Sequence, residues 1–158
     1  MRGKALLGNY VYFRDLTLQE IYQMRRLLEP ELAADLAGQL DEAQLHALTE
    51  VTESYRHPAR TAEQERVQHI DSLRFHRLLA EFAGNELLGF TIGFMAQILT
   101  EMTVYRRLYD PPNVELWARG RAFHLELIDA LRDGDRERAR GHDTGPMATA
   151  PAPAGEEG

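Results

Sequence analysis

Apolar residues recur at helical spacing in runs that open at helix-capping residues, and this pattern constrains the fold most strongly. Thr17 and Glu20 stand three residues apart, as in a capping box, just ahead of the first apolar run. We predict a helix over residues 18–39. Pro30 inside it removes one backbone hydrogen bond, so we expect a bend or a break near Leu27.

The same reasoning predicts five further helical segments along the chain. The segment after Asn85, "ELLGFTIGFMAQILTEMTVYRRL", is strongly apolar and stands between amphipathic neighbours. We therefore expect it to run through the middle of a bundle. The other predicted segments are one capped by Asp41 that runs to about Tyr55, one opened by a capping box of Thr61 and Gln64 that runs to about Phe82, one from about Val114 to Leu131, and a short basic one starting at Asp135.

Few residues fall outside this helical pattern. The stretch "NYVYF" could form a short extended arm, and residues 1–15 are expected to be an N-terminal arm or linker. Residues 142–158 are rich in Ala, Pro and Gly, and we expect a disordered tail there. The fold class that remains is all-α, with residues 16–141 forming an antiparallel bundle of about six helices.

The composition excludes several classes of protein. The 18 Lys and Arg against 25 Asp and Glu give a net charge of -7, which opposes binding of this chain to a polyanion such as DNA. The absence of cysteine excludes disulfides, thiolate metal sites and cysteine nucleophiles, so a metal would need His, Asp or Glu. No apolar run is long enough for a signal-peptide core or a membrane span. We expect a soluble protein of the cytoplasm.

Three segments resemble a known family when they are taken in order. They are "EIYQMRRLLEPELAADLA", "FHRLLAEFAGNELL" and "HLELIDALRDGDRERAR". Together they are similar to the FCD domain, the effector-binding and dimerising C-terminal half of FadR-subfamily GntR transcription regulators. The resemblance covers roughly Leu16 to Arg140. It implies a small-molecule effector, a carboxylate by preference, and a homodimer.

The resemblance also implies that DNA is bound by a winged helix-turn-helix domain that usually precedes the FCD domain. The chain has no room for that domain, so we expect either a fragment or truncated regulator, or a free-standing effector domain. DNA recognition would belong to the absent domain.

Many FCD domains hold a divalent metal such as Zn, Ni or Mn through one Asp and three His. By resemblance, the first two of those histidines are His76 and His124. The Asp position is Ser72, and the third His position falls on Pro146. Two imidazoles could still hold an ion weakly. The alternative is that the two histidines line a cavity together with Ser72. Ser72 and His76 are four residues apart, so they lie on the same face of their helix.

Three more residues are candidate ligand contacts. Arg25 lies where the family has an R-x-x-L-E run and could pair with an effector carboxylate. The alternative is that Arg25 or Arg26 pairs with Glu29 on the helix surface. Thr91 and Gln97 lie in the apolar helix, where a buried polar group needs a partner, either a ligand or a neighbouring carbonyl.

Two other functions compete with effector sensing. A carboxylate-bridged metalloenzyme in a helical bundle would use Glu-x-x-His pairs, and the sequence has none, so we do not expect an enzyme. A purely structural or heterodimerising helical module would form dimers without a cavity for a ligand. The sequence leaves this second alternative open.

Overall fold

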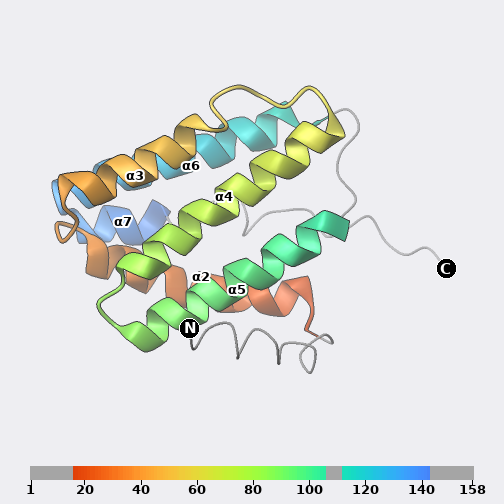
Figure 1. Cartoon of the computed structure of the whole chain (residues 1–158). Coiled ribbons are helices and arrows are strands. Elements are labelled where there is room, and N and C mark those ends of the chain that lie inside the picture. The colour runs from red at the N-terminus through yellow and green to blue at the C-terminus, as the bar shows by residue number, and fades with distance from the viewer. Residues whose placement is uncertain (1–15, 106–111, 143–158) are drawn as a thin grey trace.

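The computed structural model describes residues 16–105 and 112–142, and all regular secondary structure in these residues is helical. This confirms the predicted all-α fold. Figure 1 shows the arrangement of its six described helices. They are α2 (Leu18–Leu36), α3 (Glu42–Glu53), α4 (Ala62–Phe82), α5 (Glu86–Tyr105), α6 (Val114–Asp133) and α7 (Arg136–His142).

The helices begin at the predicted capping residues. Thr17 Oγ1 accepts a hydrogen bond from the Glu20 amide at 3.2 Å, and Glu20 Oε2 accepts one from the Thr17 amide at 2.9 Å. At Thr61 only half of the predicted capping box forms. Gln64 donates its amide to Thr61 Oγ1, but its side-chain oxygen accepts from the Arg60 amide, so the predicted reciprocal bond to Thr61 is wrong. Arg60 is the residue before the N-cap, so this hydrogen bond ties the chain just ahead of α4 to the first turn of the helix.

The bundle is organised around α4, which packs against α5 on one side and α3 on the other. In Figure 1, α3 and α6 lie side by side, and α5 lies beside α4 at the opposite side of the bundle. Helix α7 packs against α2 and α6. The largest fully buried side chains come from five helices and form one core: Leu32, Leu48, Phe75, Leu79, Ile92, Leu127 and Leu131.

Two glycines hold the ends of α2 and α6 together. Gly38 and Gly134 both have positive φ, at 74° and 69°, and a Cβ added at Gly38 would lie 3.3 Å from the Gly134 Cα. The Gly38 amide donates to the Leu131 carbonyl at 2.9 Å. This close approach fixes α2 beside α6, and therefore fixes the polar side chains that the two helices bring to the centre of the bundle.

Two predictions about the helices are wrong in part. Helix α2 runs through Pro30 without a break, because Pro30 removes only one backbone donor and its ring is buried against the core. The apolar helix α5 does not run through the middle of the bundle. Among the described helices it packs on α4 and α2. Its exposed large apolar side chains, Leu87 at 73% and Phe90 at 40%, lie in its first turns, whereas residues 91–103 are buried or half-buried.

Some predictions fall on residues that the structure does not describe. The N-terminal arm with "NYVYF" and the tail after His142, including Pro146, lie outside the described ranges. None of the described helices combines the length and the hydropathy that crossing a bilayer requires.

Candidate functional site

A chain of buried polar side chains crosses the centre of the bundle from α2 to the end of α3. It starts at Arg25, whose Nε lies 2.8 Å from Glu29 Oε1 and whose Nη2 lies 3.2 Å from Glu29 Oε2. Both side chains are only 5% exposed. The bidentate geometry satisfies both charges where water cannot reach them.

Two histidines from different helices continue the chain. His76 on α4 places its Nδ1 3.4 Å from Glu29 Oε2, within ion-pair range but outside hydrogen-bond geometry. Its Nε2 lies 3.3 Å from Nε2 of His124 on α6. The Tyr55 hydroxyl lies 2.5 Å from His124 Nδ1 and ends the chain. Phe75 stacks on the His124 ring at 4.2 Å between centroids and 10° between planes.

Burial keeps both imidazoles neutral. The pKa of His76 is lowered well below its usual value, first by burial and then by the nearby positive charge of Arg25. Burial also lowers the pKa of His124, and His76 and Arg25 add to this effect while Glu29 opposes it. The pKa of the Tyr55 hydroxyl is raised by burial, so this group is protonated at neutral pH. This row of buried polar side chains therefore holds one ion pair, Arg25 with Glu29, and three neutral groups, which are the two imidazoles and the Tyr55 hydroxyl.

The described residues do not fit a metal centre of the kind that the resemblance implies. Structural zinc sites use four protein ligands and catalytic sites usually three. Within residues 16–105 and 112–142 there is no group of three or more His, Asp or Glu that could hold an ion. His76 and His124 offer two facing nitrogens, and Ser72 lies where the family has its Asp.

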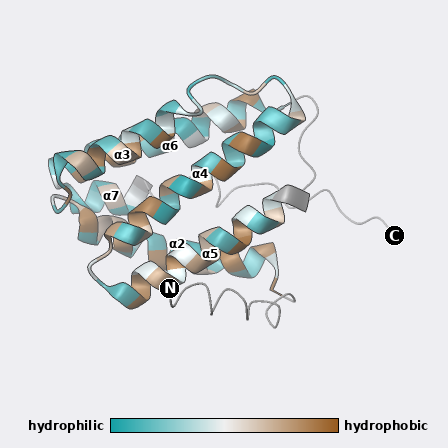
Figure 2. Ribbon diagram, viewed as in Figure 1, coloured by the Kyte–Doolittle hydropathy of each residue, from teal (hydrophilic) through white to brown (hydrophobic). Residues whose placement is uncertain are grey.

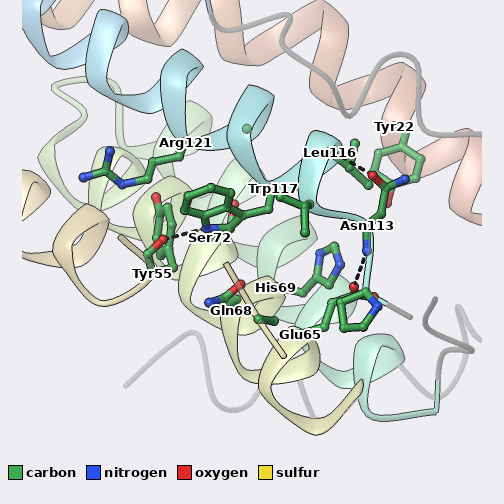
Figure 3. Close-up of a pocket in the computed structure, with 14 residues that line it drawn as sticks. Tyr22, Tyr55, Glu65, Gln68, His69, Ser72, Asn113, Leu116, Trp117 and Arg121 are labelled. Atoms are coloured by element: carbon green, nitrogen blue, oxygen red, sulfur yellow. Dashed lines mark hydrogen bonds between the residues drawn. The ribbon is translucent and has the colours of Figure 1, made fainter. Parts of the chain in front are cut away.

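A cavity of about 110 Å³ lies next to this chain, between the first halves of α4 and α6. In Figure 3, Arg121 lies at one end of the cavity, while Tyr22 and Asn113 lie at the other. Tyr55 is the link, because it lines the cavity and also binds His124. The lining residues are Tyr22, Tyr55, Ala59, Glu65, Gln68, His69, Ser72, Pro112, Asn113, Val114, Leu116, Trp117, Gly120 and Arg121.

Hydrogen bonds fix the walls of the cavity. The indole Nε1 of Trp117 donates to the Tyr55 carbonyl at 2.7 Å, which holds α6 against the end of α3. At the other end, the buried Glu65 carboxylate accepts from the Asn113 amide at 3.0 Å, just before α6 begins. The dashed lines in Figure 3 mark these contacts. Most of the wall is apolar or aromatic, which is typical of a small-molecule site.

Arg121 is the one guanidinium among the described lining residues. Its Nη2 lies 3.5 Å from Glu53 Oε1, a half-exposed carboxylate. Its Nε is buried and makes no hydrogen bond within the described part of the chain. A buried donor without a hydrogen-bond partner costs free energy.

The predicted site residues divide between three places. Ser72 lines the cavity, whereas His76 and His124 lie beside it in the buried chain. Arg25 is engaged by Glu29, the predicted alternative partner, although the pair is buried rather than on the surface.

The two predicted contacts from α5 lie elsewhere. Thr91 Oγ1 donates to the Leu87 carbonyl at 2.7 Å, the alternative partner that was expected for it. Gln97 lines an outer groove between α4 and α5 and donates to Glu101 at 3.4 Å. Neither residue is part of the described cavity wall, so this arrangement gives no support to an effector contact at either position.

Sequence reasoning missed Tyr55, Glu65 and Arg121 as site residues. Tyr55 follows α3 and Glu65 lies in the first turn of α4, so neither position shows a distinct periodic signal. Arg121 does stand in an amphipathic helix among mainly apolar neighbours, and this could have drawn attention to it.

Comparison with known proteins gives one match. The family model described as FCD domain matches residues 20–142. No curated protein and no solved structure matches the chain.

Proposed function

Because this chain belongs to the FCD domain family, an effector-binding module of GntR-type regulators, we propose that it senses a small organic acid in the cavity between α4 and α6. The observation that carries this proposal is the cavity itself. Its wall is mostly aromatic and apolar, and Arg121 is the one guanidinium side chain among its described lining residues. That combination suits a ligand with an apolar body and one carboxylate.

The size of the cavity limits the effector. At about 110 Å³ it is smaller than the roughly 300–1,000 Å³ of pockets that take drug-sized ligands. We therefore propose a small carboxylic acid or a short acyl compound. Its carboxylate would bind Arg121, in competition with Glu53, and its apolar part would pack against Trp117.

We propose that the effector binds without a metal ion. The two nitrogens that face each other, His76 Nε2 and His124 Nε2, are engaged with each other in the buried chain. The buried Arg25 and Glu29 pair already supplies the fixed charges at this place. Tyr55 lines the cavity, and its hydroxyl also contacts His124. A ligand that packs against Tyr55 would therefore act on the buried row of polar side chains through this hydroxyl.

In a regulator, the effector must bind one arrangement of the dimer better than another. We propose that the domain acts as a dimer, with DNA contacted by a separate winged helix-turn-helix domain. The net charge of -7 opposes DNA contact by this chain.

A thermal-unfolding screen of organic acids and divalent ions, each with and without EDTA, tests the proposal. An acid at 100 times its Kd should add about 2.7 kcal/mol, which raises the Tm by roughly 5–10 °C, and EDTA should not change this shift. The proposal would be contradicted if no acid raised the Tm. It would also be contradicted if EDTA abolished the rise in Tm that an acid causes.

A further inference from the structure

The first turns of α5 leave large apolar side chains exposed, although this helix is the most hydrophobic of the described helices. Its inner face carries Ile92 and Leu99 to the core. On the outer face, Leu87 is 73% exposed and Phe90 is 40% exposed. Hydrophobic segments run along α5 in Figure 2, where the helix lies at the side of the bundle. Exposed apolar side chains gathered on one face mark a contact surface.

A groove runs beside these side chains, between α4 and α5. The helices approach closely there, because a Cβ added at Gly89 would lie 2.5 Å from the Ala80 carbonyl oxygen. The small residues Ala80, Gly89 and Gly93 line the groove where the two helices meet. The lining residues are Arg77, Ala80 and Glu81 from α4, and Gly89, Phe90, Gly93, Phe94 and Gln97 from α5.

The exposed Phe90 and the half-buried Phe94 line one side of this groove and form an aromatic ridge there. Their rings stack at 5.9 Å between centroids with 19° between planes. The face thus carries an aromatic ridge and a groove next to each other. A two-fold axis through such a face can place the ridge of each copy in the groove of the other, as an isologous interface requires.

The charges at the edge of the groove fit the same arrangement. Arg77 and Glu81 stand one helical turn apart on α4, are both exposed, and make no ion pair within the described part of the chain. When two copies of α4 run antiparallel across a two-fold axis, Arg77 of one copy lies opposite Glu81 of the other. The face is therefore complementary in charge to itself.

We infer that the α4–α5 face, defined by the residues that line the groove together with Leu87, binds a second copy of this chain. The inference rests on the dimerisation in the proposed function, and it assigns the surface. The ridge of Phe90 and Phe94 enters the groove of the partner copy, and Arg77 pairs with the partner's Glu81.

Sedimentation analysis over a range of protein concentrations tests the apolar part of the face. The wild-type chain should have twice the mass of 18.0 kDa. Phe90→Glu should raise the dimer Kd by at least about tenfold, since a central aromatic anchor is replaced by a charge. Val67→Glu is the matched control, because Val67 is 50% exposed on α4 but lies roughly 15 Å along the helix from Arg77.

Charge reversal tests the two-fold pairing. Arg77→Glu and Glu81→Arg should each weaken the dimer, because each places like charges opposite one another twice across the axis. The double variant with both changes should restore the wild-type Kd. Helix content and Tm, measured alongside, identify a variant that has lost its fold.

The outcomes separate the two proposals. A monomeric wild-type chain at every concentration overturns both this inference and the proposed dimerisation. A dimer whose Kd is unchanged by Phe90→Glu, or whose charge reversals are not rescued by the double variant, overturns the assigned face alone.

Discussion

His76 Nε2 lies 3.3 Å from His124 Nε2, although the two residues come from different helices and are 48 positions apart in the sequence. One arrangement of protons accounts for the contacts that join Tyr55, His124, His76 and Glu29. The Tyr55 hydroxyl donates to His124 Nδ1, His124 Nε2–H donates to His76 Nε2, and His76 Nδ1–H faces Glu29. This arrangement needs both rings to be neutral, and it needs no ion between them.

The free energy of unfolding should fall as the pH falls below about 6.5. The pKa values of His76 and His124 are lowered in the folded protein, so below 6.5 the unfolded chain takes up protons that the folded chain refuses. The stability that the two neutral histidines contribute is therefore fully present above pH 6.5. It is lost as the pH falls from 6.5 toward their lowered pKa values in the folded protein. Denaturant unfolding between pH 5 and 7 should give a slope of up to about 1.4 kcal/mol per pH unit for each histidine.

Single variants identify the groups behind this slope. His124→Gln should reduce the slope, because it removes one of the two buried imidazoles. His46→Gln is the control, since its side chain is 71% exposed, and it should leave the slope as it is. A flat profile for the wild-type protein would show that the imidazoles are not buried in solution.

Glu29→Gln should lower the free energy of unfolding by about 3–5 kcal/mol, because it removes the carboxylate charge that pairs with the buried Arg25 guanidinium. Denaturant unfolding measures the loss. Glu50→Gln breaks the exposed pair with His46 on α3 and should have no measurable effect. Equal effects of the two variants would contradict the burial of the Arg25 and Glu29 pair.

Gly89→Ala should destabilise the fold by about 1–3 kcal/mol. The added Cβ would meet the Ala80 carbonyl oxygen at 2.5 Å, so α5 must move away from α4. Gly84→Ala is the matched change, because nothing lies within 4 Å of the Cβ added there. It should leave stability unchanged or raise it by up to about 1 kcal/mol. Thermal unfolding of both variants at one protein concentration distinguishes them.

Removal of metal should not change the stability. The described residues bring only His76 and His124 together as possible ligands, short of the three that a metal site needs. Protein purified without an affinity tag should contain less than one equivalent of Zn, Ni or Mn, and EDTA should leave its Tm unchanged. A stoichiometric ion whose removal lowers the Tm would refute the metal-free site.

Much of the fold could be predicted from the sequence because the signals are local. The caps at Thr17, Asp41 and Asn85 all form, since each depends on a side chain and an amide three residues away. The place of α5 could not be predicted this way. Its apolar composition indicates burial, but Gly89 determines how closely it packs on α4, and Leu87 and Phe90 in its first turns stay exposed.

The site was less predictable, because its contacts join distant parts of the chain. The resemblance identified His76 and His124, and spacing placed Ser72 near them. The contact of Tyr55 with His124 spans 69 positions, and no periodic signal indicates it. Whether Arg25 meets a ligand or Glu29 also depended on burial, which the sequence pattern of α2 does not reveal.

Trp117 is the only tryptophan of the chain, and it lines the cavity, so its fluorescence measures binding at this site directly. Titration with the acids that raise the Tm is the most direct test of effector binding. We predict a saturable change in Trp117 emission, and Arg121→Gln should weaken binding by at least about tenfold. Arg119→Gln, at an exposed position on the same helix, should not weaken it. An acid that stabilises the protein without changing Trp117 emission, or that binds equally well to Arg121→Gln, would contradict the account.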